Sequence, residues 1–277
     1  MMGDGVNDVL SLKKANLGIA MQSGTQATRS VADIVLLNDS FAALAPAVAE
    51  GQRIVNGMQD ILKLFLARIA TVALIIMSSL IIGVFPINVR HGSLTTLFTV
   101  GIPTVLLAVW ARPGRADRHT SLGRRLAHFV LPSALLASLL GLAVFYGTLL
   151  LRVPGIGPVE LIINPLAFTQ AVAVGQTSLS AFIVAIGLLL IVFVEPPTPW
   201  WTGGDVLSGD RRPAALAAAL AAGFAVVLAA APTRSFFELA ALSPFDISLI
   251  LAAAALWLLT VRAAWRRRWL DRFFSVR

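Results

Sequence analysis

The residues best suited to chemistry occupy the first eight positions of the chain, Met-Met-Gly-Asp-Gly-Val-Asn-Asp. Two carboxylates, Asp4 and Asp8, and the amide of Asn7 alternate there with two glycines, just ahead of an apolar run typical of a helix. Glycine lets a backbone turn tightly and approach a ligand, and carboxylate oxygens are the ligands that Mg²⁺ prefers. The stretch therefore suits a Mg²⁺ ion and a phosphoryl group, while the same residue types also make ordinary surface turns.

Four segments in a fixed order narrow this choice: residues 3–8, 12–15, 18–21 and 32–37. Their sequences and spacing resemble the P-type ATPases, and specifically the last piece of the phosphorylation domain, which has a haloacid-dehalogenase-like fold. The resemblance extends over the whole chain, because a long hydrophobic part follows the motifs as it does in that family. One departure is Met2, where the family usually has threonine.

The resemblance assigns roles to three side chains. Asp4 would bind Mg²⁺, Asp8 would support the ion through hydrogen bonds or water, and Asn7 would touch the phosphoryl oxygens. Mg²⁺ and ATP are the cofactors implied for the complete enzyme. The family's Asp-Lys-Thr-Gly-Thr phosphorylation motif, nucleotide-binding domain and first four spans do not occur in these 277 residues. We therefore expect a C-terminal fragment of a cation pump, which needs the missing N-terminal portion and hydrolyses no ATP alone.

The composition is that of an integral membrane protein. Hydrophobic residues make up 57% of the chain, charged residues only 13%, and the mean hydropathy is +0.84. A soluble domain would carry about twice that share of charge. The chain has no cysteine, which excludes a disulfide framework. Its net charge of +8 comes mainly from arginines between apolar runs, which we interpret as topology determinants, and we expect no nucleic-acid binding.

Residues 1–46 predict a small, incomplete α/β segment, by resemblance the C-terminal piece of the phosphorylation domain. Strand patterns at 17–21 and 34–37 alternate with helical patterns at 9–16 and 25–31, and residues 1–2 would end a further strand. Residues 38–40 are expected to end the last strand and to cap a helix from residue 41. So short a segment cannot bury a core of its own, so we expect partner strands outside it.

Residues 47–277 predict a membrane domain of six helices in a mainly α-helical, polytopic protein. The first helix, 47–85, would be about 55 Å long, more than the ~30 Å hydrocarbon core, so its amphipathic first half should stand outside the bilayer. Two helices with a break at Gly57 are the alternative. Pro86 should end this helix, with an external loop at 86–93. The other predicted spans are 94–110, 126–151, 166–194, 214–231 and 247–261, with external loops at 152–165 and 232–246.

Arginines cluster after the second, fourth and sixth predicted spans. Because positive loops stay on the cytoplasmic side, we expect both termini there, in a multi-pass protein of a bacterial cell membrane whose direct partner is the lipid bilayer. Tryptophans near the span ends are expected to anchor the helices at the interface. The arginines are Arg112, Arg115, Arg118, Arg124, Arg125, Arg211, Arg212, Arg262, Arg266, Arg267 and Arg268, and the tryptophans are Trp200, Trp201, Trp257, Trp265 and Trp269.

The second span holds the candidate ion path, Thr96, Thr99, Gly101 and Pro103. A glycine and a proline two positions apart favour a broken helix whose carbonyls line an ion path, and a simple proline kink is the alternative. Calcium pumps of the family carry amide and acidic ligands in these two spans, at positions that here hold Ile69, Val72, Thr96 and Val100. No carboxylate remains, so the transported cation stays open. The other polar candidates are Thr95, Gln170 and Gln176.

Among P-type ATPases the chain looks most like the actinobacterial cation-transporting ATPase E group, whose members are linked to calcium. A second class of function is a non-catalytic membrane scaffold or interaction protein derived from a pump. The DNA upstream would separate the two, because an in-frame phosphorylation motif there would make this chain part of a complete pump.

Overall fold

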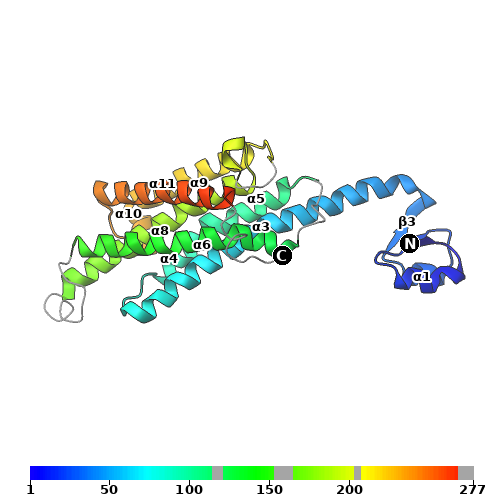
Figure 1. The fold of residues 1–277 in the computed structure, drawn as a ribbon, viewed down its shortest axis with the longest axis horizontal. Helices are drawn as coiled ribbons and strands as arrows, with labels where there is room; N and C mark the ends of the chain where they lie inside the picture. The colour runs from blue at the N-terminus through cyan, green and yellow to red at the C-terminus, as the bar shows by residue number, and fades with distance from the viewer. Residues whose placement is uncertain (114–120, 153–164, 203–206, 268–277) are drawn as a thin grey trace. The chain divides into compact units, whose positions relative to one another are not determined.

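A computed structural model of the chain describes residues 1–113, 121–152, 165–202 and 207–267, without the side chains of 79–82, and divides it into two compact units (Figure 1). The N-terminal unit holds residues 1–56 and a short stretch from Arg112. The membrane unit holds residues 57–111 and the described residues from 121 onward. Each unit is treated by itself below.

The N-terminal unit is built around a three-stranded parallel sheet. Strands β1 (Met2–Gly3), β2 (Ile19–Met21) and β3 (Ile34–Leu36) follow in that order, with Gly3 opposite Ala20 and Ile19 opposite Ile34. The connections hold a 3₁₀ turn η1 (Val6–Asp8) with helix α1 (Val9–Lys14), and helix α2 (Gln26–Val31). This confirms the predicted small α/β segment; the strand expected to end at Met2 extends one residue further, to Gly3.

The segment after β3 differs from the prediction. Two 3₁₀ turns, η2 (Leu37–Asp39) and η3 (Phe41–Ala43), precede the long helix, and the side chain of Ser40 makes no capping hydrogen bond. The carboxylate of Asp39 instead accepts a hydrogen bond from the Ser23 backbone N–H at 3.1 Å. The predicted helix cap at residues 38–40 was therefore wrong, because Asp39 is used to join two loops.

Helix α3 (Leu44–Ile82) is continuous, so the alternative with a break at Gly57 was wrong. A side chain at Gly57 would crowd Ala111, which explains why glycine is accommodated there without interrupting the helix. The helix ends at Ile82 and not at Pro86, because Gly83 adopts a φ of +76°. A glycine in this left-handed conformation commonly terminates a helix.

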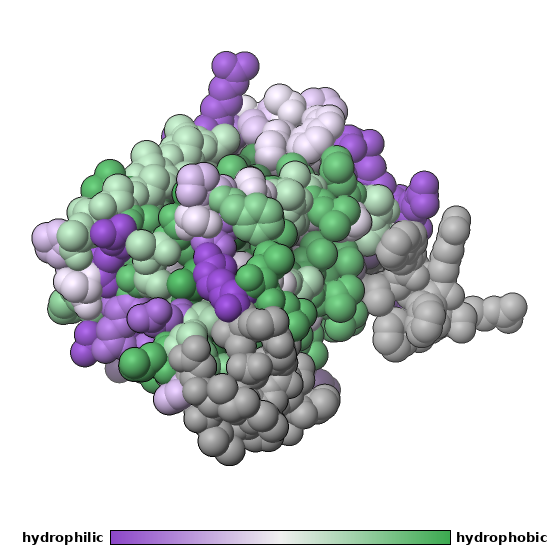
Figure 2. All heavy atoms as spheres, turned by 90° about the vertical axis from the view of Figure 1, so that its left-hand side faces the viewer, coloured by the Kyte–Doolittle hydropathy of each residue, from purple (hydrophilic) through white to green (hydrophobic). Residues whose placement is uncertain are grey.

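The described residues contain six helices long and apolar enough to cross a membrane, which confirms the predicted count. After α3 come the combined helix Val89–Trp110, then α6 (Leu122–Leu150), α8 (Pro165–Val194), α9 (Arg212–Ala229) and α11 (Pro244–Arg266). Helix α8 lies between α6, α9 and α11 (Figure 1). In the most apolar stretch of α8, 89% of the residues are buried inside the protein, against 22% in that of the long first helix. Broad hydrophobic areas on the surface fit a lipid environment (Figure 2).

Several helix boundaries lie outside the predicted ones, because capping side chains begin the helices earlier. Asn88 accepts a hydrogen bond from the Arg90 backbone N–H at 3.0 Å, so residues 89–93 of the predicted external loop are helical. Ser243 and Asp246 form a reciprocal capping box at the start of α11. A further short helix, α10 (Ala231–Phe237), occupies part of the predicted loop at 232–246.

The prediction of interfacial anchoring was wrong for two of the tryptophans. Trp257 and Trp265 are 0% and 1% exposed. Their indole N–H groups donate to the carbonyls of Ser133 and Phe129 on α6, each at 3.2 Å. They therefore fix α11 against α6 inside the membrane unit. Trp269, Arg115, Arg118, Arg268 and most of the predicted loop 152–165 lie outside the described residues.

Candidate functional site

Asp4 follows directly after β1, at the carboxyl edge of the parallel sheet. Ligands of such sheets bind in the crevice beyond the carboxyl ends of the strands. The backbone of Asp4 is held there by α2, since its carbonyl accepts hydrogen bonds from the Thr25 backbone N–H at 2.9 Å and the Thr28 hydroxyl at 3.3 Å. Thr28 is fully buried. The position of Asp4 is thus fixed by a residue 24 positions along the chain.

Asp8 folds back over the same loop. Its Oδ2 accepts hydrogen bonds from the backbone N–H groups of Asp4, at 3.3 Å, and Gly5, at 3.2 Å. A Cβ at Gly3 would lie 2.5 Å from the Cβ of Asp8, so only glycine permits this approach. The geometry gives Asp8 a positioning role on the loop that carries Asp4.

The side chains of Asp4 and Asn7 are exposed, and within the described part of the chain neither has a hydrogen-bond partner. That part also holds no group of three or more histidine, cysteine or acidic side chains able to bind a metal. Mg²⁺ commonly keeps several waters and takes one or two carboxylates together with substrate phosphate. The carboxylate of Asp4, on a loop that Asp8 holds by backbone hydrogen bonds, fits an ion of that kind. A bound Mg²⁺ would neutralise charge on a phosphoryl group.

Asp39 is a third carboxylate at this edge of the sheet, and the sequence analysis named it only as part of the expected helix cap at 38–40. The hydrogen bonds from Ser23 hold the pKa of Asp39 below its ordinary value. Its bond to Ser23 ties the loop after β2 to the turn after β3. The side-chain oxygen of Gln22 likewise accepts a bond from the Asn38 backbone N–H, at 2.6 Å. Asp39 therefore stabilises the edge at which Asp4 lies.

The second candidate region, in the membrane unit, is the helix that contains Gly101 and Pro103. The helix is not broken: α4 (Val89–Thr96) continues through a π-helical turn, η4 (Leu97–Gly101), into α5 (Ile102–Trp110). Proline lacks an N–H and crowds the preceding turn, and the wider π turn accommodates it, with the Ile102 N–H bonded to the Leu97 carbonyl. The broken-helix prediction was wrong. Pi turns of this kind frequently occur at functional sites.

The π turn packs closely on α8. A Cβ at Gly187 would overlap the side chain of Thr99, so glycine at this position allows the approach. Thr99 is buried and donates its hydroxyl to the Thr95 carbonyl at 2.7 Å. Thr96 donates to the Gly92 carbonyl, also at 2.7 Å. The predicted ion-path threonines therefore lie on one helix face, next to α8 and α3.

Arg68 on α3 reaches this threonine group, and the sequence analysis overlooked it. Its Nη2 donates to the hydroxyl of Thr95 at 2.5 Å, and to the hydroxyl of Thr96 and the carbonyl of Gly92, each at 3.3 Å. Its Nε and Nη1 are buried without a hydrogen-bond partner in the described structure. A single arginine inside the apolar run Phe-Leu-Ala-Arg-Ile-Ala was the available signal, since charges within spans usually mark function.

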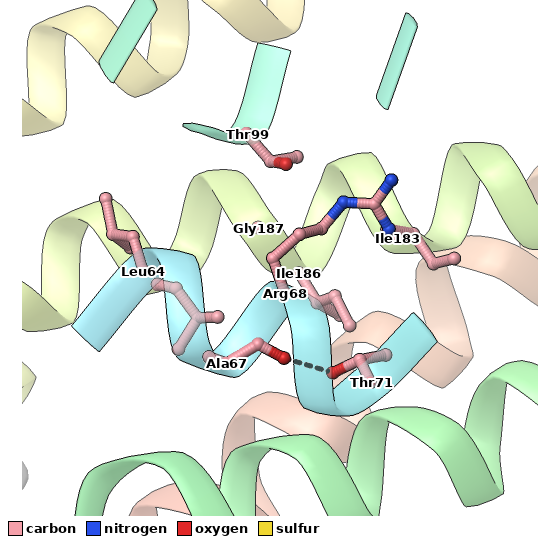
Figure 3. Close-up of a pocket in the computed structure, with 9 residues that line it drawn as sticks. Leu64, Ala67, Arg68, Thr71, Thr99, Ile183, Ile186 and Gly187 are labelled. Atoms are coloured by element: carbon pink, nitrogen blue, oxygen red, sulfur yellow. Dashed lines mark hydrogen bonds between the residues drawn. The ribbon is translucent and has the colours of Figure 1, made fainter. Parts of the chain in front are cut away.

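A small cavity adjoins Arg68 (Figure 3). Thr71 and Thr99 line it from α3 and the π turn, and Ile183 and Gly187 line it from α8. The space open to the centre of a water molecule is about 20 Å³, which is enough for one water. The Arg68 side chain extends from α3 across this space toward Ile183 (Figure 3). The cavity is too small for a cation with a full hydration shell.

The other residues predicted for the ion path do not line the cavity. Gly101 is exposed, Pro103 is buried at the start of α5, and neither lines the cavity. Gln176 donates to the Phe85 carbonyl at 2.8 Å, and so connects α8 to the segment after α3. Of the positions that carry ligands in calcium pumps, Ile69 is 49% exposed while Val100 is 7% exposed. Among the described candidates, Thr95 and Thr96 accept hydrogen bonds from Arg68, and Thr99 lines the cavity beside it.

Known proteins with similar sequences identify the family. No family model matches the chain. The calcium-transporting ATPase CtpE of Mycolicibacterium smegmatis is 34% identical over 212 residues, 73% of this chain and 25% of that protein. The protein of the same name from Mycobacterium bovis is 31% identical over 281 residues, 96% of this chain and 31% of that protein. The chain belongs to the P-type ATPases.

A short stretch is more strongly similar to a plant relative. The endoplasmic reticulum-type calcium-transporting ATPase 3 of Arabidopsis thaliana is 51% identical over 63 residues, 23% of this chain and 6% of that protein. The chain thus spans between 25% and 31% of the length of the two mycobacterial relatives.

Proposed function

We propose that this chain is the C-terminal part of an ATP-driven cation pump, which contributes the Mg²⁺ end of the phosphorylation site and part of the ion path. The observation that carries the proposal is the Asp4 loop, in which Asp8 accepts backbone hydrogen bonds and leaves the Asp4 carboxylate free. The names of the relatives, all calcium-transporting ATPases, support the pump and make Ca²⁺ the first ion to test.

In this proposal each residue of the loop has a distinct task. Asp4 and Asp8 hold Mg²⁺, Asp4 directly and Asp8 through the loop or a water, and Asn7 donates its amide to a phosphoryl oxygen. Phosphoryl transfer depends mainly on positioning and charge neutralisation. The phosphorylated aspartate and the ATP-binding site come from the rest of the pump, so the 277 residues alone hydrolyse no ATP.

We further propose that both termini are cytoplasmic. The arginine groups gather at one end of the membrane unit, since the Arg212 guanidinium lies 5.4 Å from the Trp110 ring and that of Arg262 lies 4.5 Å from the Trp200 ring. Such a basic end favours the cytoplasmic side. The chain has no cysteine, so single cysteines can be labelled cleanly. In intact cells Arg234→Cys should react with an impermeant thiol reagent and Arg124→Cys should not; the reverse pattern would invert the topology.

Asp4→Asn tests the proposed catalytic role. The pump would be a chimaera in which this chain replaces the matching stretch of the Mycolicibacterium smegmatis relative. The substitution preserves shape and removes one charge beside the metal, so ATP hydrolysis and phosphoenzyme should fall on the order of 10²-fold. Insertion into membranes should not change, because Asp4 lies in the N-terminal unit. Both quantities would be measured at matched protein amounts.

Asp39→Asn is the matched control, because it removes a carboxylate from the same sheet edge without touching the Asp4 loop. Its turnover should stay near that of the unmodified chimaera. An Asp4→Asn chimaera that keeps more than about a tenth of the activity would mean that Asp4 is a turn residue only. A chimaera that hydrolyses no ATP with Asp4 intact would instead favour a non-catalytic scaffold.

A further inference from the structure

Arg68 binds a group of oxygens that includes Thr95 and Thr96, two of the residues that the sequence analysis named as candidates for a transported cation. One nitrogen, Nη2, is within 3.3 Å of the Gly92 carbonyl and of the hydroxyls of Thr95 and Thr96. Hydroxyl and carbonyl oxygens are the groups that replace water around an ion in a membrane. In this structure a guanidinium, itself a cation, already uses them.

The charge of Arg68 has no counter-charge within the described residues. No carboxylate there forms an ion pair with it, and its Nε and Nη1 are buried without partners. By contrast, Lys63 in the same unit is paired with Asp60 at 3.4 Å, and Arg152 is paired with Asp246 at 2.6 Å. A buried charge that lacks a partner is unfavourable, so Arg68 is held in place without the compensation that a structural ion pair would have.

We propose that Arg68 is a tethered cation, which fills the oxygen group of Gly92, Thr95 and Thr96 when no ion is bound and competes with the transported cation for it. This rests on the proposed pump function and specifies how its ion site is controlled. The arginine stem is long and flexible, and Nε and Nη1 make no hydrogen bond that would hold the guanidinium against displacement from these oxygens. A transported cation would bind only after that displacement, because two cations cannot share the same oxygens.

The first experiment uses this chain alone and measures the charge around Thr96. Thr96→Cys gives a single thiol beside Arg68, in a chain that has no other cysteine. In detergent, its rates of reaction with an anionic and a cationic methanethiosulfonate are compared. The ratio of the two rates cancels the thiolate fraction, which both reagents share. With Arg68 present the ratio should favour the anionic reagent, and Arg68→Gln should lower it on the order of tenfold.

Matched variants separate charge from structure. Arg68→Lys keeps the charge and should keep a ratio near that of the parent chain, whereas Arg68→Gln keeps a hydrogen-bond donor without the charge. Val105→Cys lies about 13 Å further along the helix and is 64% exposed, and its ratio should not respond to Arg68→Gln. Equal ratios at Thr96→Cys with Arg68 and with glutamine would overturn the proposal.

The second experiment measures competition in the chimaera, with Ca²⁺ as the probe. Removal of a tethered competitor should tighten the apparent affinity, so Arg68→Gln should lower the Ca²⁺ concentration for half-maximal ATP hydrolysis on the order of tenfold. Arg68→Lys should remain near the unmodified chimaera. An unchanged or higher half-maximal concentration in Arg68→Gln would show that Arg68 only connects α3 to α4. If the unmodified chimaera shows no Ca²⁺-stimulated hydrolysis, Ca²⁺ is not its transported cation, and the thiol experiment still decides the role of the charge.

Discussion

The two candidate sites of this protein hold their charges in opposite ways. In the N-terminal unit, carboxylates lie in exposed turns at a sheet edge, and their main partners are backbone N–H groups. In the membrane unit, Asp246 is buried and Arg68 is half-buried, and their partners Arg152 and Thr95 come from distant parts of the chain. Water can replace a lost partner in the first setting and not in the second. The same substitution should therefore have very different effects on stability in the two units.

The largest effect is expected at Asp246. Its side chain is 0% exposed, and Oδ2 accepts bonds from Arg152 Nη2 at 2.6 Å and from the backbone N–H and hydroxyl of Ser243. Asp246→Asn keeps the shape but leaves the Arg152 charge uncompensated. Loss of one partner of a buried pair costs about 3–5 kcal/mol, and we expect the lower end because Arg152 is 30% exposed.

Tryptophan fluorescence measures this effect selectively, since every tryptophan lies in the sequence of the membrane unit and none in the N-terminal unit. Thermal unfolding in detergent should show a Tm lower on the order of 10 °C for Asp246→Asn. Ser243→Ala is the control, because it removes the helix cap and leaves the ion pair, and it should cost only about 1 kcal/mol. Equal Tm shifts for the two variants would contradict the comparison.

The difference between partners that are close in the sequence and partners that are distant also decides which features the sequence could predict. Within the loop from Gly3 to Asp8, Asp8 bonds the backbone of its neighbours, and the resemblance to the family predicted the place of this loop at a strand end. The bonds that hold Asp4 to α2 are long-range, and the sequence did not predict them. The six spans followed from composition, because burial in lipid needs long apolar runs. Arg68 and its acceptors are 24 to 28 positions apart and meet only through helix packing, which periodicity does not report.

Local signals also failed where two of them competed. Gly83 and Pro86 both end helices, and the glycine acts first along the chain. Trp257 and Trp265 suited either an interface or a core, and the α6 carbonyls that accept their N–H groups decided for the core. Mg²⁺ binding by the loop from Gly3 to Asp8 stays a prediction, because the described residues hold no group of three or more side chains that could bind a metal on their own.

The smallest effect is expected at Asp39, with the same change of aspartate to asparagine. Its side chain is hydrogen-bonded to Ser23 in an exposed turn, and that bond holds the pKa of Asp39 below its ordinary value. A group with a lowered pKa in the folded state stabilises the fold above its ordinary pKa, and the contribution disappears as the pH falls through the lowered pKa. Asp39→Asn should therefore weaken the turn slightly at neutral pH and make no difference in strong acid.

Amide hydrogen exchange in the segment that contains Ser23 measures this difference, because the N-terminal unit has no tryptophan. The variant and the parent chain are compared at each pH, so the intrinsic exchange rate cancels. From pH 7 to about pH 5 the variant should exchange faster, since an amide oxygen accepts the Ser23 N–H bond more weakly than a carboxylate. As the pH falls further, through the lowered pKa of Asp39, the two rates should converge because the carboxylate takes up a proton. A difference that stays constant or grows in acid would show that the charge of Asp39 does not hold this edge, and that exposed and buried carboxylates do not differ here in the way the two units suggest.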